Sequence, residues 1–189
     1  MKLTTDQQRA LKVMRSGVNV FLSGASGTGK SFLIKQFMEE NKNKNIIICA
    51  PKGMAAAGAG DDTLHSVFAI PKGILKVGDY NSKPEKAVMD ADIVIIDDIS
   101  MCRIDVFEYV VRTLLNIRKN LKLEGDMDHY EKQIILSGDF YRMPPVINRE
   151  DKHDFLANWG FKRGEDRFAF NSSLWDELSK VNIILGEQV

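Results

Sequence analysis

The chain has 189 residues, enough for one globular domain, or for one domain with a small appendage. Hydrophobic residues make up 44% and charged residues 28%, both ordinary for a protein that buries a core. The formal net charge is zero, which disfavours a protein that coats nucleic acid with a uniformly basic surface but leaves room for a local basic groove.

The chain carries no targeting or membrane signal that we can identify. Its first ten residues are polar, unlike a secretory signal, and its longest apolar runs, 45–50 and 91–96, are too short to cross a bilayer. Cys49 and Cys102, the only cysteines, lack metal-type spacing and are expected to be reduced, buried thiols. We therefore expect an intracellular protein without a membrane partner, cytoplasmic in a bacterium and nuclear or mitochondrial in a eukaryote.

The first third of the chain predicts a helix, a strand and a second helix. Thr5 and Gln8 resemble a capping box for a helix that ends near Gly17. Residues 18–23 are β-branched and aromatic, which favours a strand. Residues 29–41 predict a helix whose apolar face comprises Phe32, Leu33, Phe37 and Met38.

The rest of the chain continues this alternation. Unbroken apolar runs, typical of strands covered on both faces, occur at 45–50, 91–97 and 132–139, and a last strand is predicted at 181–185. Helices are predicted at 104–120 and, after an Asn or Ser cap, at 171–180, whereas the polar segment 146–167 is typical of an insertion or long loop. The pattern indicates an α/β domain with a mainly parallel sheet flanked by helices.

The stretch "GASGTGKS" at 24–31 fits the phosphate-loop pattern GxxxxGK[ST] and joins a predicted strand to a predicted helix. Glycines let backbone N–H groups point at phosphate oxygens, and the helix start adds its dipole. Lys30 is expected to reach the β- and γ-phosphates of a nucleotide, and Ser31 to place its hydroxyl on Mg²⁺. The nucleotide-binding residues predicted in this loop are Gly24, Gly27, Thr28, Gly29, Lys30 and Ser31.

Two further strand ends supply polar groups that a nucleotide site needs. Asp97 follows a buried strand, where its carboxylate is expected to hold magnesium through the water shell of the ion, and Asp98 could orient and deprotonate an attacking water. Gly138 and Asp139 end another buried strand, and Arg142 just beyond could bind the terminal phosphate as a cation. Together these residues predict a site that senses the γ-phosphate.

These motifs, in this order, resemble the PIF-type (petite integration frequency) DNA helicases of superfamily 1B over nearly the whole chain. The matching stretches are "LTTDQQRAL" (motif Q), "GASGTGKS" (motif I), "APKGMAAAGAGDDTLHSVF" (motif Ia), "IIDDISMCRIDVFEYV" (motif II), "SGDFYRMPPV" (motif III) and "FAFNSSLWDEL". Motifs Ia and III are the specific ones, although the related RecD-type helicases share motif III.

The resemblance implies a RecA-like motor domain, called 1A, over 1–189, in a 5′–3′ helicase that couples ATP hydrolysis to translocation on single-stranded DNA. It implies ATP and Mg²⁺ as cofactors and Gln7 as the residue that reads adenine. It also implies DNA contacts from motif Ia, for which Lys52, Thr63 and His65 are the candidates. Phe68 could stack on a base, although a core position is favoured.

The sequence departs from the family pattern at three residues. Asp98 replaces the usual Glu and is one methylene shorter, Arg142 replaces the usual Gln, and Lys52 replaces Thr. The second RecA-like domain, with its arginine fingers, is not recognised in these residues. We therefore expect the chain, as a monomer, to bind nucleotide, to hydrolyse it slowly and not to unwind DNA alone.

Two other functions are compatible with the phosphate loop. A nucleotide-dependent binding switch without turnover would explain Asp98 and the lack of a recognised second domain. A small phosphate-loop kinase is less favoured, because it gives no reason for "TLHS" or "GDFYRMPP". Stimulation of ATP loss by single-stranded DNA or by a small acceptor separates the helicase from the kinase, and tight binding without turnover identifies the switch.

Overall fold

A computed structural model of the chain describes residues 3–51, 62–124, 132–160, 167–178 and 180–186. Within these residues a single sheet of six strands has the order β3-β2-β4-β5-β1-β6, and every neighbouring pair is parallel. The strands are β1 (Val20–Gly24), β2 (Ile46–Ala50), β3 (Asp62–Thr63), β4 (Ile93–Ile96), β5 (Gln133–Gly138) and β6 (Val181–Leu185). The predicted parallel α/β architecture is confirmed.

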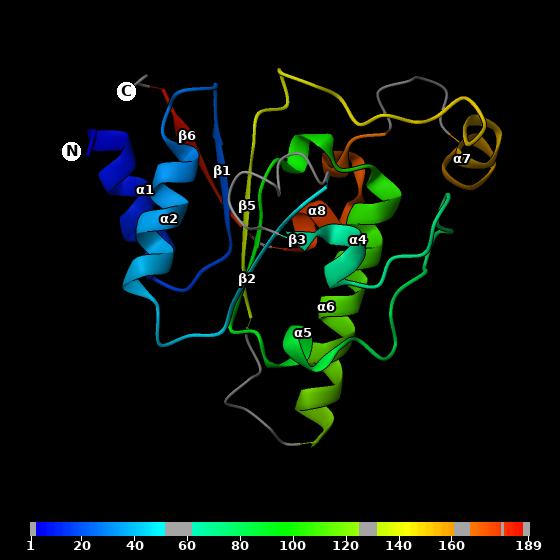
Figure 1. Cartoon of the computed structure of the whole chain (residues 1–189), viewed down its shortest axis with the longest axis horizontal. Coiled ribbons are helices and arrows are strands. Elements are labelled where there is room, and N and C mark those ends of the chain that lie inside the picture. The colour runs from blue at the N-terminus through cyan, green and yellow to red at the C-terminus, as the bar shows by residue number, and fades with distance from the viewer. Residues whose placement is uncertain (1–2, 52–61, 125–131, 161–166, 179, 187–189) are drawn as a thin grey trace.

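Helices cover both faces of this sheet, as Figure 1 shows: α1 and α2 lie on one side, and α5, α6 and α8 on the other. The α-helices are α1 (Thr5–Arg15), α2 (Lys30–Glu40), α4 (Leu64–Val67), α5 (Lys86–Asp90), α6 (Ile104–Glu124), α7 (Lys152–Trp159) and α8 (Ser173–Glu177). Two short 3₁₀ helices are η1 (Ile99–Met101) and η2 (Ala169–Asn171). Among the described residues, no helix is long and apolar enough to cross a membrane.

The central strands show why the apolar runs are unbroken. In β4, Ile93 and Ile95 join the core under α1 and α2, while Val94 and Ile96 join the core under α6. All four side chains are buried, because successive residues point to opposite faces and both faces are covered. The carboxyl ends of these strands meet along one edge, where the phosphate loop also begins.

Two local predictions for the first two helices need correction. The capping box uses Thr4 and Gln7, one residue earlier than predicted, because the Thr4 hydroxyl accepts from the Gln7 N–H. Phe32 is exposed, and Ile34 instead joins Leu33 and Phe37 on the buried face of α2. The predicted helix is therefore present, but its buried face is formed by Leu33, Ile34 and Phe37.

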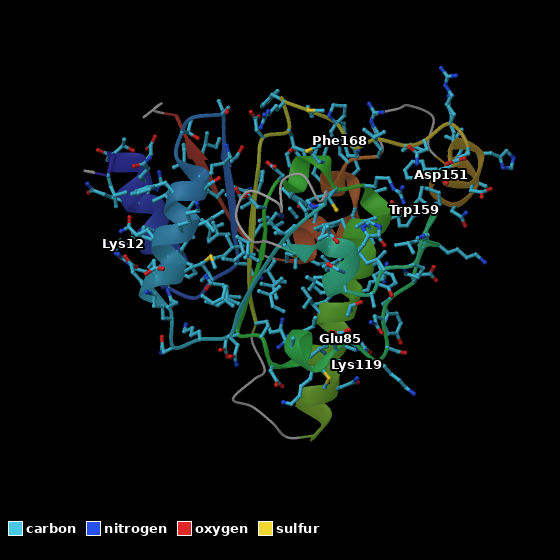
Figure 2. The ribbon with its side chains drawn as sticks, viewed as in Figure 1. Lys12, Glu85, Lys119, Asp151, Trp159 and Phe168 are labelled. Atoms are coloured by element: carbon cyan, nitrogen blue, oxygen red, sulfur yellow. The ribbon has the colours of Figure 1, made fainter. Side chains whose placement is uncertain are left out.

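The segment predicted as a loop at 146–167 contains helix α7, whose Phe155 and Trp159 are buried in a small separate cluster with Ile104. Figure 2 shows Trp159 on the side of the molecule opposite Lys12 of α1. Two apolar residues four apart were the available signal for this helix, and the surrounding charges obscured it.

The two cysteines are buried as predicted. Burial raises the pKa of the Cys102 thiol well above its usual range, so this thiol is protonated at neutral pH. Neither sulfur has the exposure of a reactive cysteine.

Candidate functional site

The phosphate loop connects β1 to α2 and depends on glycine at three positions. Gly27 and Gly29 have φ of 84° and 85°, a region that other residues rarely adopt. At Gly24 a side chain has no room, since a Cβ atom would lie 2.7 Å from the Thr28 Oγ1 and 2.9 Å from the Leu185 carbonyl oxygen. The glycines therefore serve the path of the loop and its close packing against β6.

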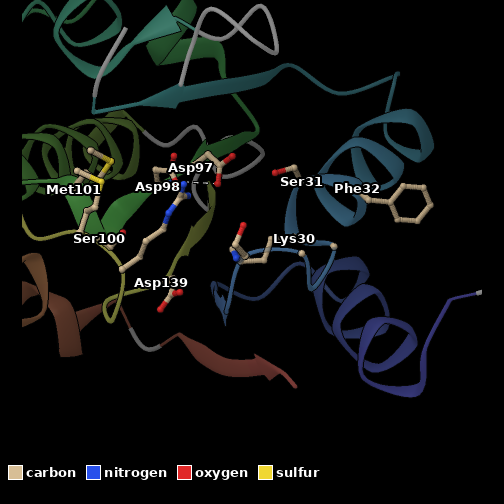
Figure 3. Close-up of a pocket in the computed structure, with 13 residues that line it drawn as sticks. Lys30, Ser31, Phe32, Asp97, Asp98, Ser100, Met101 and Asp139 are labelled. Atoms are coloured by element: carbon tan, nitrogen blue, oxygen red, sulfur yellow. Dashed lines mark hydrogen bonds between the residues drawn. The ribbon is translucent and has the colours of Figure 1, made fainter. Parts of the chain in front are cut away.

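The two polar side chains at the start of α2 lie at the mouth of this loop. The Lys30 Nζ donates to the carbonyl oxygens of Gly24, at 2.6 Å, and Ala25, at 3.0 Å. Ser31 is exposed on the first turn of the helix. Figure 3 shows Lys30 and Ser31 facing the carboxylates of Asp97 and Asp98 across the pocket, while Phe32 points away.

Asp97 and Asp98 follow β4 directly. The Asp97 N–H donates to the Cys49 carbonyl at 2.9 Å, and the Asp98 N–H donates to the Asp97 Oδ1 at 3.0 Å. Asp98 has a left-handed backbone, with φ of 51°, which aspartate tolerates better than most residues. Burial, and then the charge of Asp97, raise the pKa of Asp98, whereas Arg142 and Lys30 act in the opposite direction.

The third side of the site follows β5. The Arg142 N–H donates to the Asp139 carbonyl at 3.1 Å, and the Asp139 Oδ1 accepts from the Tyr141 N–H at 3.0 Å. Gly138 lets β5 approach η1 closely, because a Cβ atom there would lie 3.1 Å from the Ser100 nitrogen. Arg142 is thereby held in a short turn beside the aspartates.

These three segments line one pocket of about 640 Å³ at the carboxyl edge of the sheet. The predicted site residues that line it are Gly27, Gly29, Lys30, Ser31, Asp97, Asp98 and Arg142, together with Asp139. Hydroxyl and carboxylate oxygens are the donors that Mg²⁺ prefers, so Ser31 and Asp97 fit the ion they were predicted to hold. The pocket is also lined by residues that were not predicted as site residues. Ser26, Ser100, Met101 and Met143 lie inside the quoted motif stretches, and Phe32 lies just after one of them.

Gln7, Gly24 and Thr28 were predicted to bind nucleotide but are not among the lining residues. Gln7 is buried, its Nε2 donates to the Thr28 carbonyl at 3.1 Å, and its Oε1 accepts from the Thr4 N–H at 3.1 Å. Gln7 thus ties the phosphate loop to the start of α1. The Thr28 hydroxyl donates back to the Ala25 carbonyl and stabilises the loop from within.

The residues predicted to contact DNA lie in and before α4. Thr63 pairs with Ala50 at the carboxyl end of β2, and its hydroxyl caps α4 by accepting from the Ser66 N–H at 3.1 Å. His65 is exposed, and partial burial of its ring followed by the charge of Arg103 lowers its pKa. Lys52 lies outside the described residues, and Phe68 is a core residue, as favoured from the sequence.

Known proteins with similar sequences support the family resemblance. The family model of PIF1-like helicases matches residues 2–184. The ATP-dependent DNA helicase PIF1 of Candida albicans is 31% identical over 98% of this chain and 20% of its own length. ATP-dependent DNA helicase Pif1 of Bdellovibrio bacteriovorus is 35% identical over 87% of this chain and 36% of its own length.

Solved structures agree with the sequence relatives. Bacteroides Pif1 bound to single-stranded DNA superposes with a TM-score of 0.79 at 29% identity, over 100% of this chain and 43% of that one. The complex of Bacteroides Pif1 with ADP-AlF3 and single-stranded DNA gives 0.80 at 28% identity, over 100% of this chain and 43% of that one. The chain belongs to the PIF1-like helicase family and has the RecA-like fold. It spans 20–43% of the length of these relatives.

Proposed function

We propose that this member of the PIF1-like helicase family is the ATP-binding motor domain of an ATP-dependent DNA helicase. The observation that carries the proposal is the convergence of Lys30, Asp97, Asp98 and Arg142 on one pocket at the end of β1, β4 and β5. Helicase relatives named for ATP dependence, and a relative bound to ADP-AlF3 and single-stranded DNA, support the same reading.

Each residue has a role that follows from its chemistry. Lys30 moves from the loop carbonyls to the β- and γ-phosphates, and Ser31 and Asp97 hold Mg²⁺, which neutralises phosphate charge when bound. Asp98 orients the attacking water and accepts its proton. Arg142 donates to the terminal phosphate, but unlike glutamine it has no acceptor to offer the water.

The same proposal assigns single-stranded DNA to the surface at Thr63 and His65, with Lys52 as a further contact. Two solved structures of Bacteroides Pif1 contain single-stranded DNA. His65 is neutral at pH 7 because its pKa is lowered. It therefore contacts DNA by hydrogen bonding or stacking, and Lys52 supplies charge to a backbone phosphate.

Hydrolysis of ATP with and without a thymidine oligonucleotide tests this function. We expect slow hydrolysis that DNA stimulates and that Lys30→Ala abolishes. Stimulation by a small phosphate acceptor instead of DNA would contradict the proposal in favour of a kinase. Lys30-dependent binding without any turnover, even in Asp98→Glu, would favour a nucleotide-dependent binding switch.

Two coarser proposals accompany this one. An intracellular, reducing compartment is supported by the buried thiols of Cys49 and Cys102. A monomeric state is expected, and sedimentation equilibrium at several protein concentrations tests it. A mass that rises towards twice 21.3 kDa would contradict it.

A further inference from the structure

A buried ion pair lies between the motif II aspartates and the segment that follows the DNA candidates. Arg103 Nε donates to the Asp105 Oδ1 at 2.9 Å, and Arg103 Nη2 donates to the Asp105 Oδ2 at 2.7 Å. The Asp105 side chain is 0% exposed and that of Arg103 15% exposed. The two parallel hydrogen bonds fix the orientation of both side chains. Removal of one partner leaves the other with a largely buried, uncompensated charge.

Both members of this pair hydrogen-bond to the backbone of segment 69–81, which we call the strap. Arg103 Nη2 donates to the Gly73 carbonyl at 2.8 Å, and the Asp105 Oδ2 accepts from the Leu75 N–H at 3.2 Å. The strap has a second anchor, because Trp159 Nε1 donates to the Leu75 carbonyl at 2.6 Å. The strap is therefore held by Trp159 of α7, by Asp105 in the first turn of α6 and by Arg103, which precedes α6.

The strap begins directly after the helix that carries His65. The Ile70 N–H donates to the His65 carbonyl at 3.1 Å, and the Asn81 Nδ2 donates to the Phe68 carbonyl at 3.3 Å. The charges of Arg103 and Asp105 both act on His65, the first lowering and the second raising its pKa. The ion pair is thus connected to the DNA candidate through the hydrogen bonds of the strap, and its charges influence the pKa of His65.

At its other end the ion pair is close to the nucleotide pocket. Between Asp98 and Arg103 lie only η1 and Cys102, and the Met101 N–H donates to the Asp98 carbonyl at 2.9 Å. This turn packs against Gly138 so closely that a Cβ atom there would lie 3.1 Å from Ile99 Cγ2. The backbone between the pocket and the ion pair is therefore short and closely packed.

We propose that Arg103 and Asp105 are positioning residues that couple the nucleotide pocket to the DNA-contacting surface at His65. They touch neither ligand. They keep the strap, and with it α4, at a defined place relative to the Asp97–Asp98 turn, so that a change in the turn on nucleotide binding reaches His65. This inference rests on the proposed function, and the coupling it describes is a free energy between two sites.

Histidine ring NMR spectra provide a direct test, because His65, His129 and His153 are the only histidines of the chain. Spectra are recorded with and without saturating Mg²⁺ and a non-hydrolysable ATP analogue, AMPPNP, whose affinity is measured separately. In the wild-type chain we expect the His65 signals to shift, and those of the exposed His153 to stay in place.

Asp105→Asn keeps the shape of the side chain and removes its charge. We expect the His65 shift to fall by about threefold or more while the affinity for AMPPNP changes by less than about threefold. A merely structural role would leave the shift intact in a folded variant. Arg103→Lys keeps the positive charge but loses the bidentate geometry of the guanidinium. We expect it to reduce the His65 shift by a smaller factor. This variant is the test if Asp105→Asn does not fold.

An unchanged His65 shift in the folded variants would overturn the inference. So would a wild-type His65 that does not respond although AMPPNP saturates the protein, and in that case the proposed function stands. Failure of AMPPNP to bind in a Lys30-dependent manner would overturn the proposed function, and the inference with it.

Discussion

The phosphate loop and the strap are both irregular segments beside functional surfaces, yet they are held in different ways. In the loop, the side chains of Thr28 and Lys30 bond to carbonyl groups three to six residues away. In the strap, Leu75 is held by Asp105 and Trp159, which lie 30 and 84 residues away. The loop is thus specified mainly by its own sequence, and the strap by elements that fold elsewhere.

Removing the anchor of the strap is expected to have the largest effect. Asp105→Ala leaves the largely buried Arg103 guanidinium without its carboxylate and the Leu75 N–H without an acceptor. We expect the free energy of unfolding in urea to fall by about 3 kcal/mol. Asp79→Ala is the matched control, because that strap carboxylate is exposed and, within the part of the chain that the structure describes, accepts only from the Lys76 N–H. Equal losses in the two variants would show that the strap does not depend on its distant anchor.

The phosphate loop should be disrupted by an added side-chain atom rather than by loss of a distant contact. Gly24→Ala places a methyl group 2.9 Å from the Leu185 carbonyl, so the backbone of the loop or of β6 must shift. We expect a loss of roughly 1–3 kcal/mol in the free energy of unfolding, together with weaker ATP binding. Gly186→Ala is the control, since its Cβ atom would meet Asp6 Oδ2 at an ordinary 3.7 Å. Unaltered ATP affinity in Gly24→Ala would contradict the tight packing of the loop.

The role of residue 98 as the general base can be tested by lengthening its side chain. Asp98→Glu extends the carboxylate by one methylene towards the water it is proposed to orient. We expect turnover at saturating ATP to rise on the order of tenfold. The left-handed backbone at this position suits glutamate less well than aspartate, so a small loss of stability should accompany the gain. No increase in turnover would count against residue 98 as the base.

A smaller effect is expected for the dependence of stability on pH, through His65 beside the strap. Burial and Arg103 lower the pKa of His65 in the folded chain from the usual 6.5, so the unfolded chain binds its proton more readily. The free energy of unfolding should therefore decrease as pH falls below 6.5. Urea unfolding at pH 7.5 and 5.5 should show a smaller decrease in His65→Gln than in wild type, and equal decreases would contradict this.

The contrast between loop and strap also explains what the sequence could predict. The glycine pattern, Lys30 and Ser31, and the aspartates at the end of a buried apolar run are local signals, and all of these residues except Gly24 and Thr28 line the pocket. The assignment of Gln7 to adenine came from the family resemblance alone. The sequence did not indicate its hydrogen bond to Thr28, which lies 21 residues away. The strap, α7 and the Arg103–Asp105 pair depend on long-range contacts, which periodicity and capping do not reveal.

Equilibrium binding of labelled ATP in the presence of Mg²⁺ tests the central claim most directly. The wild-type chain is compared with Lys30→Ala and with Lys35→Ala, which removes an exposed lysine from the same helix. We predict that the wild type and Lys35→Ala bind ATP with similar affinity, and that Lys30→Ala loses at least about tenfold in affinity. Equal affinities in the two variants would contradict the assignment of this pocket to a nucleotide.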